Sequence, residues 1–206
     1  NLGGYANDWQ MFKVSPYRQT IKLEADMLCC SPIDHWWTLF EHRDVVISQG
    51  ARTYYDQPAT SRYYRRIFDE NNLPDVYNAI TYWSVSNTAK EFFGLVRNIF
   101  EHWEVYKTLL KYPDEQATTD VVYALAANSI GVENCTLPEC DFINFTHMKN
   151  SINNWPESTP WPELVISEFD LPMIRINNVN QYHPFHYYEK DWITDNIVKE
   201  YEKCLK

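Results

Sequence analysis

Short apolar runs alternate along this chain with longer segments that repeat apolar residues at helical spacing. Residues 44–48 and 76–85 are rich in β-branched and aromatic side chains, which predicts strands, whereas 87–110 has the periodicity of an amphipathic helix. Such alternation is typical of α/β proteins, in which a mostly parallel central sheet is flanked by helices. We expect this architecture, followed by a C-terminal β-hairpin over 163–178 and a final helix over 191–206.

Local signals place further elements. Ser31 is a suitable N-cap and Pro32 suits the first helical position, so we expect a helix to begin there. A second helix, over 117–131, ends at Gly131, because glycine is a common residue just past a helix end. The remaining predictions are strands over 9–14, 20–28 and 141–149 and a helical segment that ends at 68.

The composition limits the partners that the chain can bind. With 206 residues, of which 45% are hydrophobic, the chain is long enough for one domain, 1–206, with a stable core. The net charge of −10 disfavours nucleic acid, and the one dense basic cluster is Arg62, Arg65 and Arg66. No long uncharged apolar run predicts a membrane span. The residues favour no particular oligomeric state.

The cysteines indicate a reducing compartment. Their number, five, is odd, and Cys29 and Cys30 are adjacent in a predicted strand, which favours free thiols over a disulfide framework. Cys135 and Cys140 are close enough in sequence to close a small loop, but the pattern does not require it. No secretory signal pattern is visible either. We therefore expect a cytoplasmic protein.

Two carboxylates interrupt the predicted strand over 20–28. Side chains two residues apart in an extended segment point the same way, so Lys22, Glu24 and Asp26 would share one face. One interpretation is an amphipathic strand whose polar side faces water. The other is a carboxylate pair for Mg²⁺ or Mn²⁺, since such ions take oxygen ligands from one or two carboxylates and from substrate phosphates. Periodicity alone leaves both interpretations open.

The segment SPYRQTIKLEADMLCCSPIDHWWTLF, residues 15–40, resembles the metal-binding segment of GT-A nucleotide-sugar glycosyltransferases, particularly those of glycosyltransferase family 8. Glu24-Ala25-Asp26 occupies the position of the family's DxD motif, and Pro32-Ile33-Asp34 and Leu39-Phe40 follow at matching distances. The resemblance implies a GT-A-like fold and a divalent cation bound at this motif. Glu24 departs from the family's first Asp, which affects the contact expected with the donor ribose.

Three later segments resemble the family in the same order. Asn78 falls at the Asn of its NSG strand, and Asp120 falls at the second Asp of its DQD helix. His147 and Trp155 fall at the two ends of its HxxGxxKPW loop. The resemblance implies that His147 is a metal ligand and Asp120 a catalytic or acceptor-side group. It also implies that Asn78 and Trp155 bind donor or acceptor.

Several positions depart from the family pattern. Thr118 and Thr119 replace the family's DQ pair, and Ala79 and Ile80 replace the Ser and Gly of its NSG strand. Asn153 stands where the family has a phosphate-binding Lys. We expect Lys149, in the same loop, to supply that positive charge instead.

The resemblance implies an enzyme that moves a sugar from a nucleotide-diphosphate-sugar donor to a carbohydrate or glycoconjugate acceptor. Mn²⁺ or Mg²⁺ would be held by Asp26 and His147, with Glu24 in support, and would neutralise charge on the leaving diphosphate. The departures favour a second hypothesis, a non-catalytic carbohydrate-binding or interaction module. A two-carboxylate glycoside hydrolase is a third, and it requires a second acid across a cleft.

Enzymes of this kind carry a β-α-β segment ahead of the DxD motif, and a shorter segment precedes Glu24 here. We therefore expect residues 1–206 to be the C-terminal portion of such an enzyme.

Other candidate residues have weaker support. His183 and His186 form a short histidine pair, but no acidic or cysteine residue lies nearby in sequence to complete a metal site. Trp155 and Trp161 lie in a proline-rich loop. An exposed tryptophan there suits sugar stacking, and packing against the sheet is equally compatible with the pattern.

Overall fold

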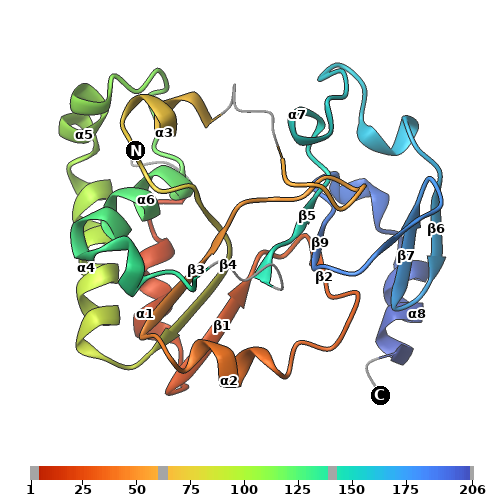
Figure 1. Ribbon diagram of the computed structural model, residues 1–206, viewed down its shortest axis with the longest axis horizontal. Coiled ribbons are helices and arrows are strands. Elements are labelled where there is room, and N and C mark those ends of the chain that lie inside the picture. The colour runs from red at the N-terminus through yellow and green to blue at the C-terminus, as the bar shows by residue number, and fades with distance from the viewer. Residues whose placement is uncertain (1–4, 60–64, 139–142, 205–206) are drawn as a thin grey trace. The chain divides into compact units, whose positions relative to one another are not determined.

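The computed structural model describes residues 5–59, 65–138 and 143–204 (Figure 1). Helices and strands are mixed along these residues, so the protein belongs to the mixed α/β class. The chain divides into two compact units, each assembled from three separate segments. Unit 1 consists of Asn1–Leu23, Trp36–Gln49 and Tyr63–Cys140. Unit 2 consists of Glu24–His35, Gly50–Arg62 and Asp141–Lys206.

Unit 1 contains one three-stranded sheet and several helices. Its strands are β1 (Gln19–Leu23), β3 (Val45–Gln49) and β4 (Val76–Ser84). Its helices are η1 (Asp8–Gln10), α1 (Met11–Val14), α2 (Trp36–Phe40), α3 (Arg66–Glu70), α4 (Asn87–Glu101), α5 (Trp103–Leu110), α6 (Thr119–Ile130) and η3 (Val132–Asn134).

The central strand of this sheet, β4, runs antiparallel to both neighbours. Gln19 of β1 lies opposite Ser84 on one side, and Val45 of β3 lies opposite Trp83 on the other. The prediction of a mostly parallel sheet therefore does not hold for the described residues. A parallel pair of strands needs a crossover connection that packs back onto the same sheet. The connection between β3 and β4 is different, because its residues 50–62 belong to unit 2.

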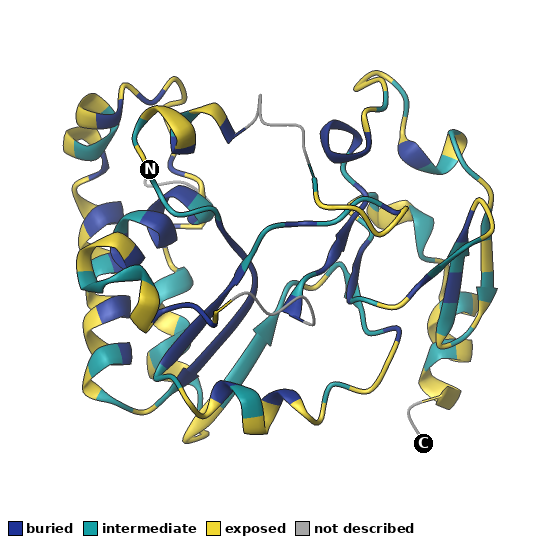
Figure 2. Ribbon diagram, in the orientation of Figure 1, coloured by how far each residue is buried: buried dark blue, intermediate teal, exposed yellow. Residues whose placement is uncertain are grey.

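The core of unit 1 lies between its sheet and its helices. α4 and α6 pack against each other, α4 against β3 and α6 against β4. β3 and β4 are buried along almost their whole length (Figure 2). Aromatic rings fill much of this core, and Phe92 meets Tyr123 edge-on with 5.2 Å between centroids. Ser86 caps α4, since its hydroxyl accepts the backbone N–H of Ala89.

Several predicted elements of unit 1 are changed in the structure. The helix predicted over 87–110 is interrupted at His102 and becomes α4 and α5. Residues 9–14, predicted as a strand, lie in η1 and α1, because six residues are too few for periodicity to separate the two conformations. α2 begins at Trp36, so neither Ser31 nor Pro32 starts it. α6 does end before Gly131, whose φ is 91°.

Unit 2 contains two small sheets. In the first, β9 (Phe185–His186) lies between β2 (Met27–Leu28), which is antiparallel to it, and β5 (Thr146–His147), which is parallel. The second is the antiparallel sheet β6 (Ser167–Asp170), β7 (Met173–Ile176) and β8 (Val179–Gln181). The helices of unit 2 are α7 (Asn150–Asn153), η5 (Trp161–Glu163), η6 (Lys190–Trp192) and α8 (Asp195–Cys204).

The C-terminal predictions are confirmed, because β6 and β7 form a hairpin and α8 follows. Of the strand predicted over 141–149, β5 is the part that forms, and residues 141 and 142 lie outside the described residues. A separate apolar core holds unit 2 together, and Trp161 and Phe185 are fully buried in it. Trp161 is therefore a core residue and not an exposed sugar platform.

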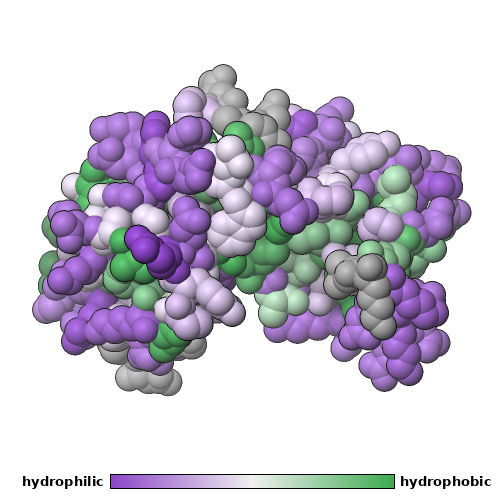
Figure 3. All heavy atoms as spheres, turned by 90° about the horizontal axis from the view of Figure 1, so that it is seen from below, coloured by the Kyte–Doolittle hydropathy of each residue, from purple (hydrophilic) through white to green (hydrophobic). Residues whose placement is uncertain are grey.

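Much of the surface of the protein is polar. Hydrophilic residues cover most of the face seen in Figure 3, in keeping with the net charge of −10. Among the described residues, none of the helices combines the length and the apolar character that a membrane crossing requires. Cys29, Cys30, Cys135 and Cys204 are free thiols, and Cys140 lies outside the described residues.

Candidate metal centre

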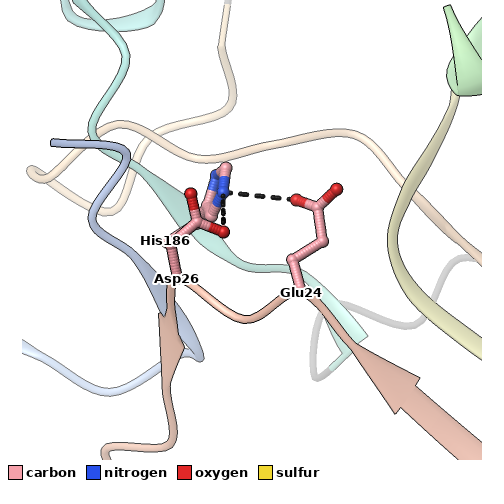
Figure 4. A group of neighbouring side chains, drawn as sticks. All are labelled: Glu24, Asp26 and His186. Atoms are coloured by element: carbon pink, nitrogen blue, oxygen red, sulfur yellow. Dashed lines mark ion pairs between the residues drawn. The ribbon is translucent and has the colours of Figure 1, made fainter. Parts of the chain in front are cut away.

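Three side chains of unit 2 converge on one point. The Nε2 atom of His186 lies 3.0 Å from Oδ1 of Asp26 and 3.2 Å from Oε2 of Glu24 (Figure 4). One ligand atom from each of the three lies within 4.8 Å of the other two. Two neighbouring ligands of an octahedral ion at about 2.1 Å lie about 3 Å apart, so these spacings suit Mg²⁺ or Mn²⁺.

A break in the predicted strand produces this convergence. β1 ends at Leu23 and β2 begins at Met27, so Glu24 and Asp26 belong to a short turn and not to one continuous strand. The assumption that they share a strand face is therefore wrong. The turn is fixed by β2, in which Met27 lies opposite His186, and by the N–H of Tyr187, which donates to the carbonyl of Asp26 at 3.1 Å.

His147 is the strand neighbour of His186 and is not a member of the convergent group. The two histidines are partners across the parallel strands β5 and β9. Their rings stack with 4.5 Å between centroids, and the two Nδ1 atoms are 2.7 Å apart. One proton can lie between two such nitrogens, so one histidine donates and the other accepts. The resemblance assigned His147 as a ligand, but the convergent group of described residues contains His186 in that place.

The charge state of the site also suits a cation. The hydrogen bond from His186 is the main reason that the pKa of Asp26 lies below its ordinary value, and partial burial opposes it. The carboxylate therefore stays ionised at neutral pH. Two carboxylate oxygens and one imidazole nitrogen form a donor set that accepts Mn²⁺ readily, and Mg²⁺ through its oxygen atoms.

Asn153 organises the loop that carries His147. Its Nδ2 donates to the carbonyls of His147 and Lys149, and its Oδ1 accepts the N–H of Tyr54. The side chain is buried and engaged at both ends. Asn153 thus holds the loop in shape at the position where the family pattern has a phosphate-binding Lys.

The other two predicted residues of unit 2 lie on this loop or close after it. The Nζ atom of Lys149 lies 5.9 Å from the centroid of the Tyr188 ring. Trp155 is half-buried and stacks on Tyr54 with 5.2 Å between centroids.

Asn78 and Asp120 are joined to each other in unit 1. The backbone N–H of Asn78 donates to Oδ1 of Asp120 at 2.8 Å, and Nη1 of Arg65 donates to Oδ2 at 3.0 Å. Oδ1 of Asp120 therefore ties α6 to β4, and Oδ2 is engaged by Arg65, the residue before α3. The side-chain amide of Asn78 approaches Asp8 at 3.4 Å.

Asp8 allows a test of this network. Burial raises the pKa of its carboxyl, while the charge of Lys22 and the contacts with Asn78 and Thr119 oppose the rise. The folded state then binds the Asp8 proton more readily than the unfolded state. The free energy of unfolding therefore falls as the pH rises from the unfolded pKa of Asp8 through its folded pKa. Asp8→Asn should therefore raise the free energy of unfolding at pH 7 and change it little below the unfolded pKa of about 3.9. Urea unfolding at both pH values measures this, and destabilisation at pH 7 would contradict it.

The sequence offers only weak support for His186 as a metal ligand. Its acidic partners are 160 or more positions away in sequence, and the pairing of β9 with β2 brings them together. The neighbouring His183 contacts a different acidic residue, since its Nε2 lies 3.0 Å from Oδ1 of Asp56. The interpretation of His183 and His186 as a histidine pair therefore does not hold.

No protein family model, curated protein or solved structure matches this chain.

Proposed function

We propose that the protein is a divalent-cation-dependent transferase that uses a nucleotide-diphosphate sugar as donor and a carbohydrate or glycoconjugate as acceptor. The observation that carries the proposal is the convergence of Glu24, Asp26 and His186, with ligand atoms within 4.8 Å of one another. It is supported by the resemblance of the segment around Glu24 and Asp26 to the donor-binding motif of GT-A glycosyltransferases.

The residues of the site have distinct tasks in this proposal. Asp26 and Glu24 supply negatively charged oxygen ligands, and His186 supplies Nε2, which must be unprotonated to bind a cation. The cation would take the place of the proton that Nε2 of His186 shares with Asp26 in the metal-free protein. Neutral His186 would then carry its proton on Nδ1 and donate it to Nδ1 of His147, 2.7 Å away. This hydrogen bond fixes both the tautomer and the ring orientation of His186.

The cation, Mn²⁺ or Mg²⁺, would stabilise the negative charge that develops on the diphosphate as the sugar departs. Lys149 carries a second positive charge in the loop of His147, and this charge would attract a phosphate oxygen of the donor. Glu24 and Asp26 cannot bind a diphosphate without a cation, because like charges repel.

A second candidate function is a non-catalytic module that binds a nucleotide or sugar. The specific observation in its favour is Asp120, the residue assigned to catalysis by resemblance, whose two oxygens are occupied by Arg65 and by the backbone of Asn78. A carboxylate held in this way suits a structural role better than a role in proton transfer.

Calorimetry with UDP and GDP, in the presence and absence of Mn²⁺, tests both candidates. We expect nucleotide binding that requires Mn²⁺, and we expect Asp26→Asn to weaken it at least about 10-fold, because an amide oxygen replaces a charged ligand. Glu168→Gln, which removes a charge from the exposed pair with Arg175, is the control and should leave binding unchanged.

A panel of UDP- and GDP-sugars then separates the two candidates. Mn²⁺-dependent transfer or hydrolysis of one donor supports the transferase. Binding of a nucleotide without turnover of any donor supports the module, and binding that is independent of both Mn²⁺ and Asp26 contradicts the transferase.

A further inference from the structure

Tyr188 has an unusual backbone conformation next to the candidate metal centre. Its φ is 61°, in the left-handed region that bulky residues rarely adopt. The N–H of Glu189 donates to the carbonyl of Tyr187 at 2.6 Å, which closes a tight turn with Tyr188 at its centre. A strained residue persists only where its surroundings hold it, and such residues cluster at functional sites.

The residue before this turn is anchored on both sides. The N–H of Tyr187 donates to the carbonyl of Asp26, and the carbonyl of Tyr187 accepts the indole N–H of Trp161 at 2.6 Å. The Tyr187 ring packs on Trp192, with 5.7 Å between centroids. Tyr187 therefore serves the core of unit 2, and the turn directs Tyr188 away from it.

The Tyr188 ring stands beside the two histidines. Its centroid lies 6.1 Å from that of His147 and 6.5 Å from that of His186, and it is nearly perpendicular to both rings. Lys149 places its ammonium 5.9 Å from the same centroid. Tyr188 nevertheless keeps 45% of its surface exposed. An aromatic ring, an ammonium group and a candidate cation site thus lie together, with the ring accessible to solvent.

We propose that Tyr188 is a specificity-determining residue that packs against the sugar ring of the donor, while Lys149 binds the phosphate to which that sugar is attached. This inference rests on the function proposed above. The C–H faces of a pyranose are apolar and pack against an aromatic ring. An aromatic ring also tolerates polar groups next to its edge and its face.

The position of the ring distinguishes the sugar from the nucleobase. Tyr188 contacts His186, which supplies the nitrogen ligand of the cation, and the cation would hold the diphosphate. The sugar is joined directly to that diphosphate, whereas the base lies beyond a ribose. A ring so close to the cation is therefore better placed for the sugar than for the base.

The strained conformation provides a sharp test. Glycine adopts positive φ without strain, so Tyr188→Gly removes the ring without imposing a new backbone conformation. We expect its melting temperature to equal or exceed that of the wild type, and its Mn²⁺ affinity to be unchanged. In the presence of Mn²⁺, the wild type should bind one of UDP-glucose, UDP-galactose or GDP-mannose more tightly than the corresponding diphosphate. Tyr188→Gly should lose that preference, about 3- to 10-fold, and Tyr188→Phe should keep it.

Tyr182→Ala is the matched control, since Tyr182 is also on the surface of unit 2, with 60% of its area exposed. The proposal is overturned if Tyr188→Gly keeps the preference for the sugar nucleotide, or if the wild type has none. An equal loss for UDP and its sugar conjugates would place the ring on the nucleoside instead. A marked fall in melting temperature would make Tyr188 a packing residue. If Mn²⁺-dependent binding of both UDP and GDP is missing in the wild type, the function proposed above is what has failed.

Discussion

His186→Ala is expected to abolish measurable Mn²⁺ binding. His186 provides the nitrogen atom on which both carboxylates converge, at 3.0 Å for Asp26 and 3.2 Å for Glu24. Its removal leaves two like charges close together without their shared partner, and the cation loses a ligand. Titration calorimetry with MnCl₂ alone, without nucleotide, gives the most direct measurement. Circular dichroism of the same variant checks that unit 2 is still folded.

His147 is the informative comparison, because it and His186 are strand neighbours of the same residue type. If His147 orients His186 through the 2.7 Å contact between Nδ1 atoms, His147→Ala should weaken Mn²⁺ binding roughly 10- to 100-fold and not eliminate it. His147→Asn should restore most of the affinity, since Oδ1 of asparagine accepts a hydrogen bond close to where Nδ1 does. The opposite order, with His147→Ala more severe than His186→Ala, would make His147 the ligand, as the resemblance implies.

Arg65→Ala is expected to produce the largest loss of stability. The guanidinium is 2% exposed, with Nη2 2.6 Å from Asp75 and Nη1 3.0 Å from Asp120. It also lies over the rings of Phe68 and Tyr77, at 3.6 and 4.0 Å from their centroids. Removing one partner of a buried ion pair costs about 3–5 kcal/mol. We expect a value near 3 kcal/mol, because both carboxylates are partly exposed to water.

Thermal unfolding measures this loss as a fall of about 6–12 °C in melting temperature. Arg66→Ala is the matched control, since the next residue along the chain is 79% exposed and pairs with Glu70 on the surface. That change should cost no more than about 0.5 kcal/mol. Similar costs for both arginines would contradict the structural role of Arg65. The comparison also corrects the prediction that Arg62, Arg65 and Arg66 form one basic cluster. Arg65 is internal, and Arg62 lies outside the described residues.

The candidate site was partly predictable from the sequence. Glu24 and Asp26 are recognisable because two carboxylates interrupt an apolar run, and the expectation of a metal site there rests on the resemblance of the surrounding segment to a DxD motif. The reason that they meet was not predictable, since the pattern indicated one strand face and the structure places them in a turn between β1 and β2. His186 was not predictable as their partner, because a ligand that arrives from a distant strand leaves no local signal.

The sequence by itself determined which segments form many of the helices and strands and which of their faces are buried. β3, β4, α4, α6, the β6–β7 hairpin and α8 all follow from local apolar periodicity, caps and turn residues. Tertiary structure alone decided which strands became neighbours, and in which direction. A strand's own residues specify its buried face but not its partner, because backbone hydrogen bonds are the same for any neighbour. The antiparallel setting of β4 and the register that places His186 against His147 and beside Asp26 depend on packing between segments far apart in sequence.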